Sequence, residues 1–134
     1  MGREKDVTGR TGEIEAVGFL RRNGYAIIAT NIRTPFGELD IVAKKGGYTV
    51  FVEVKTRATP SLGPPCLAVH GKKAHHIIKN ALHYLMKQNK VDSFWRIDVV
   101  SVTVNSGRRA ETIELIENAI TADDYYSDMN GIYI

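Results

Sequence analysis

The sequence predicts an α/β fold, a mixed β-sheet flanked by helices with the element order α-β-β-β-α-β-β. Two observations predict it: apolar residues recur at helical spacing in two segments, and five short β-prone runs lie between and after them. At 134 residues the chain fits a single domain, and its hydrophobic fraction of 43% is ordinary for a globular protein. No apolar run approaches the roughly 20 residues that a membrane helix needs, so no membrane partner is expected.

The first helix is expected over residues 8–23, after a frayed leader at residues 1–7. Its core stripe at i, i+3 and i+4 consists of Ala16, Phe19 and Leu20. Gly9 and Gly12 each cost a helix about 1 kcal/mol relative to alanine. Their presence therefore predicts close packing of this helix over the sheet.

A short strand is expected at residues 25–29 and an irregular stretch at 31–35. A hairpin follows, with strands at 38–43 and 48–56 around a Gly46-Gly47 turn. Alternation places two sets of side chains on opposite faces of the first hairpin strand: Leu39, Ile41 and Ala43, and Glu38, Asp40 and Val42. The second hairpin strand is almost continuously apolar, as expected of a central strand that is covered on both faces.

The second half of the domain begins with a loop at residues 59–65, which holds three of the four prolines. The clearest helix follows at residues 71–89, and a strand is expected at 94–104. A further strand at 112–116 would pair with it as a hairpin. The helix stripe consists of Ala74, Ile77, Ile78, Ala81, Leu82 and Leu85. One domain over 8–120 with an acidic tail at 121–134 accounts for this pattern.

The charge distribution favours a polyanionic partner. Formal net charge is +3, but residues 118–134 hold three Asp and neither Lys nor Arg, which leaves +6 on residues 1–117. A basic body suits nucleic acid, through phosphate contacts and counterion release. A polar N-terminus without an apolar h-region, and Cys66 as the single cysteine, indicate a cytoplasmic protein.

The candidate site begins with Glu53 and Lys55, which share one face of the central strand. Asp40 precedes Glu53 by 13 positions across the glycine turn, so the two carboxylates are expected opposite each other. Like charges in that position destabilise a sheet, and a divalent cation between them would remove the conflict. Oxygen ligands suit Mg²⁺ or Mn²⁺, and Lys55 would reach a metal-bound water or a phosphate. A structural ion-pair network is the alternative.

Several other residues could be metal ligands or nucleophiles, but each also has a plain structural interpretation. Glu13 in the first helix could add a direct or water-mediated metal ligand, although a solvated helix acid would look the same. The four histidines, at 70, 75, 76 and 83, lack the spacing of a zinc site. Cys66 has no base at a recognisable spacing. Arg96 and Asp98 are expected to form a structural ion pair.

The order Glu13, Asp40, Glu53-Val54-Lys55 resembles the PD-(D/E)xK nuclease superfamily, in particular the small archaeal Holliday-junction resolvases. The surrounding residues are more similar still to the uncharacterised bacterial YraN-like family. They include Thr11-Gly12-Glu13, Gly24-Tyr25, Asn31-Ile32-Arg33, Phe36-Gly37-Glu38-Leu39-Asp40-Ile41-Val42, Val50-Phe51-Val52-Glu53-Val54-Lys55-Thr56-Arg57, Ala68-Val69, Lys72, Ala81, Tyr84-Leu85 and Arg96-Ile97-Asp98-Val99-Val100. The resemblance covers about residues 8–120.

This resemblance implies a restriction-endonuclease-like fold in which Asp40 and Glu53 bind the metal and Lys55 orients or activates the attacking water. Lys72 matches a family lysine and would contact phosphate. Lys79 on the same helix would extend a nucleic-acid track, or would simply belong to a solvated polar face.

Arg33 and Arg57 could also bind phosphate, or orient the carboxylates. The expected partner is nucleic acid, DNA in preference to RNA, and a homodimer would suit a substrate with two strands to cut. Two functions follow: a Mg²⁺- or Mn²⁺-dependent endonuclease for DNA, branched or otherwise structured DNA included, or a non-catalytic binding module that retains the nuclease fold.

Overall fold

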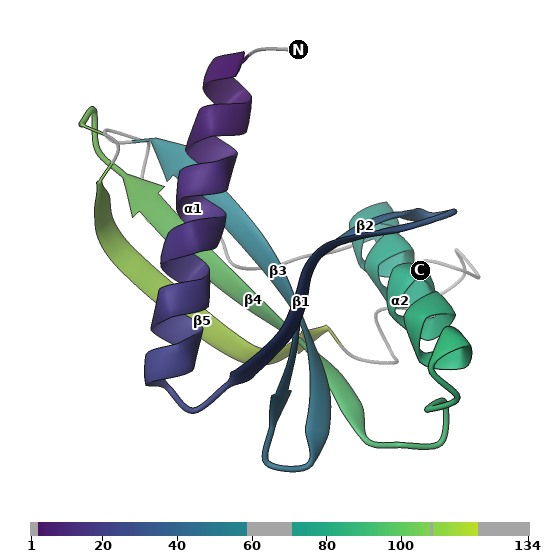
Figure 1. Cartoon of the computed structure of the whole chain (residues 1–134). Helices are drawn as coiled ribbons and strands as arrows, with labels where there is room; N and C mark the ends of the chain where they lie inside the picture. The colour runs from purple at the N-terminus through teal and green to yellow at the C-terminus, as the bar shows by residue number, and fades with distance from the viewer. Residues whose placement is uncertain (1–2, 59–70, 108, 121–134) are drawn as a thin grey trace.

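The computed structural model describes residues 3–58, 71–107 and 109–120, and these contain two helices and five strands (Figure 1). In chain order the elements are α1 (Arg3–Arg22), β1 (Ala26–Thr34), β2 (Gly37–Lys45), β3 (Tyr48–Ala58), α2 (Gly71–Lys87), β4 (Trp95–Val104) and β5 (Ala110–Ile120). The predicted order is confirmed, and β5 is longer than predicted. The loop predicted at 59–65 and the tail at 121–134 lie outside the described residues.

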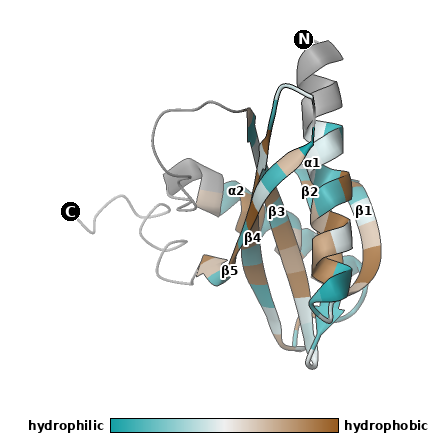
Figure 2. Ribbon diagram, turned by 90° about the vertical axis from the view of Figure 1, so that its left-hand side faces the viewer, coloured by the Kyte–Doolittle hydropathy of each residue, from teal (hydrophilic) through white to brown (hydrophobic). Residues whose placement is uncertain are grey.

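The five strands form one mixed sheet in the order β1-β2-β3-β4-β5. Neighbouring strands are antiparallel except β3 and β4, which are parallel. A parallel pair needs a crossover connection, and α2 lies in the connection between these two strands. The helices cover opposite faces of the sheet, α1 on one and α2 on the other (Figures 1 and 2).

Each helix closes its own buried cluster. The cluster under α2 contains Phe51, Ile97 and Val99 from the central strands, with the predicted stripe of α2 itself. The cluster under α1 contains Ala16 and Leu20 from the helix and, from the central strands, Val50, Val52, Val100, Val102 and Val104. Both central strands are therefore buried on both faces, as predicted, and Figure 2 shows hydrophobic residues concentrated along them.

The beginning of the chain differs from the prediction. The helix starts at Arg3, so the expectation of a frayed leader over residues 1–7 and a start at Thr8 was wrong. Arg, Glu and Lys are good helix formers, and no Pro or Gly interrupts residues 3–8. Extending an existing helix by one residue costs far less than nucleating one, so the polar segment continues the helix that the buried stripe stabilises.

The first strand was also predicted wrongly. The short strand at 25–29 and the irregular stretch at 31–35 are one strand, β1, which runs to Thr34. A bulge near its start and Asn31 at φ 53° break its alternation, which is why its sequence does not read as a strand. Backbone pairing with β2 stabilises the segment despite its polar composition.

The outer half of the β1–β2 hairpin leaves the plane of the sheet. The pairs between β2 and β3 extend only as far as Ile41 with Val52, and β1 with β2 then bends toward α2 while β3 continues along β4 (Figure 1). Leu39 consequently packs in the cluster under α2, not with Ile41 and Ala43 as predicted. The divergence of β2 from β3 creates the place where the candidate site lies.

Candidate metal and nucleic-acid site

Asp40 lies where β2 and β3 diverge. The last pair of β2 with β3 is Ile41 with Val52, so Asp40 and Glu53 are the next residues along the two strands, just beyond the paired part of the hairpin. Gly46 and Gly47 both have positive φ, which fixes the tight turn that sets this register. The Val54 N–H donates to Asp40 Oδ2 at 2.9 Å. A side-chain carboxylate therefore accepts the β3 amide at the point where the regular strand pairing has ended.

The environment of Asp40 disfavours its charge. Burial, followed by the negative charge of Glu53, raises the pKa of this carboxyl to about 7. The Val54 N–H acts in the opposite direction, while Glu13 and Glu38 add to the increase. Acidic side chains from α1, β2 and β3 thus converge on one half-buried carboxyl.

Glu53 and Lys55 follow Phe51 at alternate positions of β3, so both belong to the face that α2 covers. Both side chains are half-buried. Their placement follows from the strand period, and the sequence predicted it.

Gly12 brings α1 against the sheet. A Cβ at this position would lie 2.9 Å from Thr56 Cβ, closer than real side chains approach, so only glycine fits where the helix crosses β3. The predicted close packing is confirmed for Gly12. Around a Cβ at Gly9 there is open space, so close packing was the wrong reason for that residue.

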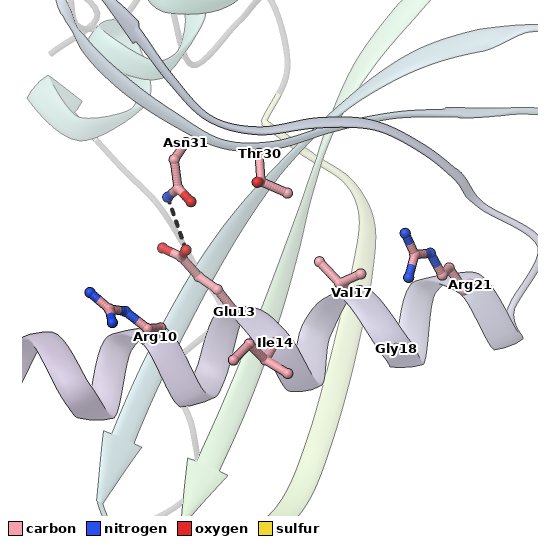
Figure 3. A pocket seen from close by; sticks show the side chains of 8 residues that line it. All are labelled: Arg10, Glu13, Ile14, Val17, Gly18, Arg21, Thr30 and Asn31. Atoms are coloured by element: carbon pink, nitrogen blue, oxygen red, sulfur yellow. Dashed lines mark hydrogen bonds between the residues drawn. The ribbon is translucent and has the colours of Figure 1, made fainter.

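Glu13 follows Gly12 and points toward β1. Its Oε1 accepts a hydrogen bond from Asn31 Nδ2 at 2.9 Å (Figure 3). Asn31 adopts the left-handed backbone conformation that asparagine tolerates better than most residues. The contact links α1 to the bent part of β1 and fixes the carboxylate of Glu13 near Asp40.

The donor set fits a hard divalent cation. Within the described parts of the chain, no group of three or more His, Cys, Asp or Glu side chains is arranged to hold a metal ion. Mg²⁺ is commonly held by one or two protein carboxylates, with waters and substrate phosphates as the remaining ligands. Asp40 and Glu53 could provide two such carboxylates, and a cation between them would relieve the repulsion that helps to raise the pKa of Asp40.

An open groove of about 490 Å³ runs between α1 and β1 beside Glu13 (Figure 3). Arg10 and Arg21 stand toward its two ends, with Ile14, Val17 and Gly18 between them on the helix. The sequence analysis did not identify this groove. The sequence carries only a weak sign of the groove, because it is the bend of β1 in the folded protein that brings Thr30 and Asn31 over this side of α1.

The predicted phosphate-binding residues are distributed around the diverging strands. Arg33 is exposed on the outer half of β1, and Arg57 is half-buried near the end of β3. Lys79 of α2 places its Nζ 5.1 Å from the ring centroid of Phe36, in the β1–β2 turn. Lys72 lies in the first turn of α2, and its side chain is outside the described residues.

Asp98 forms a separate polar cluster, as the sequence predicted. Arg96 Nε lies 3.0 Å from Asp98 Oδ1, and the Asn118 N–H donates to the same oxygen at 2.8 Å. The Tyr25 hydroxyl donates to Asp98 Oδ2 at 2.7 Å. Burial, together with this bond to Asp98, raises the pKa of the Tyr25 hydroxyl. Every oxygen of this buried carboxylate is thus satisfied, which indicates a structural role.

Comparison with known proteins identifies relatives along most of the chain. The profile of "Uncharacterised protein family UPF0102" matches residues 12–102, which include Glu13, Asp40, Glu53 and Lys55. A UPF0102 protein of Geobacter metallireducens is 48% identical over 111 residues, covering 83% of this chain and 89% of the relative. Another, from Desulfosudis oleivorans, is 41% identical over 123 residues and covers 92% and 97%. A third, from Caldicellulosiruptor saccharolyticus, is 40% identical and covers 83% and 94%.

Proposed function

The chain belongs to the uncharacterised protein family UPF0102, and we propose that it is a Mg²⁺- or Mn²⁺-dependent endonuclease that hydrolyses phosphodiester bonds in DNA. The observation that carries the proposal is the half-buried carboxyl of Asp40, whose pKa is raised to about 7 by burial and by Glu53. Carboxylates gathered in this way suit a site that is completed by a cation. The resemblance to PD-(D/E)xK nucleases supports the same assignment.

Asp40 and Glu53 would hold the metal, with Glu13 as a direct or water-mediated third ligand. When bound, the metal supplies Lewis-acid polarisation of the phosphate and lowers the pKa of a water. The Val54 N–H fixes the orientation of the Asp40 carboxylate before any substrate arrives. Lys55, two positions beyond Glu53 on the same face, would orient the attacking water and stabilise the negative charge that develops on the phosphate oxygens.

Arg33, Arg57, Lys72 and Lys79 would contact the phosphate backbone on both sides of this centre. Contacts of this kind position a nucleic acid without reading its sequence, and a domain this small has few elements for reading bases. We therefore propose recognition by backbone and shape, with branched or otherwise structured DNA among the substrates. None of the described helices is long and apolar enough to cross a membrane. We also propose that the protein acts in the cytoplasm and that it acts as a homodimer on substrates with two strands to cut.

The test is cleavage of labelled linear, flapped and four-way DNAs with Mg²⁺, Mn²⁺ or EDTA. Asp40→Asn and Lys55→Met should each lower the cleavage rate by about 100-fold or more, since the first removes a charged metal ligand and the second removes the cation that would stabilise the reacting phosphate. Glu38→Gln is the matched control, because it removes an exposed carboxylate two residues from Asp40 on the same strand. Cleavage that survives Asp40→Asn would exclude this site as the catalytic centre.

The second candidate function is a DNA-binding module without cleavage. Among the described residues, no three His, Cys, Asp or Glu side chains are arranged to hold a metal ion. This observation favours a domain that binds DNA without cutting it. DNA binding that is unchanged by Asp40→Asn, with intact substrate after long incubation in Mn²⁺, would favour this reading over the enzyme.

A further inference from the structure

The turn that joins β1 to β2 is fixed to α2. The Thr34 hydroxyl donates to Asn80 Oδ1, and the Phe36 N–H donates to Thr34 Oγ1 at 3.0 Å. Asn80 is almost fully buried and donates through Nδ2 to the carbonyl of His76 on its own helix, at 2.9 Å. Gly37 has φ 142°, a conformation that favours glycine. These contacts hold the turn in one position over α2.

This fixed turn presents an aromatic ring. Phe36 is 44% exposed, although it is a large apolar side chain with a buried cluster nearby. Lys79 Nζ lies 5.1 Å from the ring centroid, and the His83 ring meets Phe36 edge-on with centroids 6.0 Å apart. A single exposed Phe is ordinary on a protein surface. An aromatic ring that is fixed by a hydrogen-bonded turn and flanked by two nitrogen-bearing side chains has the composition of a base-stacking site.

Phe36 and Asp40 belong to one short segment. Four residue steps along the strand separate them by about 13 Å, roughly the length of four stacked nucleotides and of fewer nucleotides when a nucleic-acid strand is extended. The outer half of β1–β2 carries the exposed Arg33, and Lys79 faces the same turn. Cations that suit phosphates and a ring that suits a base therefore occur together within a few nucleotides of the candidate metal site.

We propose that Phe36 is a stacking platform for an unpaired nucleobase of the DNA strand held at Asp40 and Glu53, with Lys79 beside it on the adjoining phosphate. The inference rests on the proposed DNA-binding function and adds the substrate class: DNA with an unstacked or single-stranded base close to the bond that is cut. In a continuous duplex both faces of every interior base are already stacked on neighbouring bases, so no base face is free to stack on the Phe36 ring.

The test measures binding, so that it does not depend on cleavage. Fluorescein-labelled flapped DNA and blunt duplex of the same length are titrated in EDTA and in Ca²⁺, and the dissociation constants are obtained by anisotropy. Phe36→Leu should weaken flap binding by roughly 5- to 100-fold and change blunt-duplex binding by less than about 2-fold, because loss of one stacked base costs this much. Phe36→Trp keeps an aromatic ring at this position, so it should bind flapped DNA about as tightly as wild type does. Thermal unfolding of each variant confirms that it is folded.

Phe94→Leu is the matched control, because Phe94 is 73% exposed and packs on Tyr48 at the opposite end of the β2–β3 hairpin, with ring centroids 5.7 Å apart. It should leave both dissociation constants unchanged. A 2-aminopurine in the flap should be quenched by wild type and by Phe36→Trp but not by Phe36→Leu.

Equal effects of Phe36→Leu on flap and duplex, or no effect on either, would overturn the platform while leaving a DNA-binding function intact. Phe36-dependent flap binding without cleavage in Mn²⁺ would support the platform and contradict only the enzyme. A wild-type protein that binds neither DNA would overturn both proposals.

Discussion

Two aspartates of the same sheet, Asp98 and Asp40, lie in opposite electrostatic environments. Asp98 of β4 is fully buried, yet Arg96, Tyr25 and the Asn118 N–H satisfy its carboxylate. Asp40 of β2 is only half-buried, and its charge is opposed by burial and by Glu53. The ionised form of Asp40 is therefore less stable than that of Asp98, although Asp40 is the less buried of the two.

The difference separates a structural carboxylate from the carboxylate that we propose as a metal ligand. A buried charge that has a cation and hydrogen-bond donors stabilises one arrangement of the core and needs nothing further. A carboxyl that is surrounded by other carboxylates stays in conflict until a cation or a proton arrives. The contrast predicts opposite responses to neutralisation: loss of stability at Asp98, and gain at Asp40.

The largest expected effect is at Asp98. Asp98→Ala should lower the free energy of unfolding by about 3–5 kcal/mol, because it leaves the guanidinium of Arg96 and the hydroxyl of Tyr25 without their buried acceptor. Urea denaturation at pH 7 measures this. Glu117→Gln is the control: Glu117 also meets Arg96, at 3.8 Å, but is half exposed, so its loss should cost less than about 1 kcal/mol. Equal losses in the two variants would show that the cluster is not the cause.

Asp40→Asn should instead stabilise the protein at high pH. The folded-state pKa of about 7 lies above the ordinary value of 3.8, so the folded state retains a proton that the unfolded state has lost between these values. Wild type therefore loses stability as the pH rises from about 4 to 7, and the neutral amide does not. In EDTA at pH 8 we expect the variant to be more stable by about 2–4 kcal/mol, and at pH 3 the two should be equal.

Thermal unfolding across this pH range, with Glu38→Gln as the control, checks the prediction. Glu38 is exposed and makes the smallest of the named contributions to the pKa of Asp40, so its variant should keep most of the pH dependence of wild type. A stabilisation by Asp40→Asn that is the same at pH 3 and pH 8 would point to a hydrogen-bonding change and not to the charge of Asp40.

The smallest expected effect is that of the metal. Mg²⁺ or Mn²⁺ at about 100 times its dissociation constant should stabilise wild type at pH 8 by about 2.7 kcal/mol, since it binds the folded state alone. Asp40→Asn should abolish this shift, and Glu38→Gln should retain it. The readout is the increase in Tm with metal concentration, together with calorimetric titration of each variant. An equal shift in Asp40→Asn would indicate binding elsewhere.

Most of the fold and the centre of the site could be predicted from the sequence. The stripes of the two helices, the continuous apolar run of β3 and the double glycine at 46–47 are local patterns. The turn also sets the register, and the register brings Asp40 and Glu53 to the point where the β2–β3 pairing ends. The extent of β1 could not be predicted, because a bulge and a positive φ at Asn31 remove its period and only pairing with β2 stabilises it.

The sequence by itself determined the α/β order, the two-sided burial of the central strands and the β2–β3 register that brings Asp40 and Glu53 to the end of the paired segment. These depend on periodicity and turn chemistry between near neighbours. Only the tertiary structure decided that the outer β1–β2 hairpin bends onto α2, that Leu39 changes its partners, that Glu13 meets Asn31 and that Phe36 lies beside Lys79. Those contacts join residues far apart in the chain, and the packing of whole elements selects among many arrangements that the local sequence permits equally.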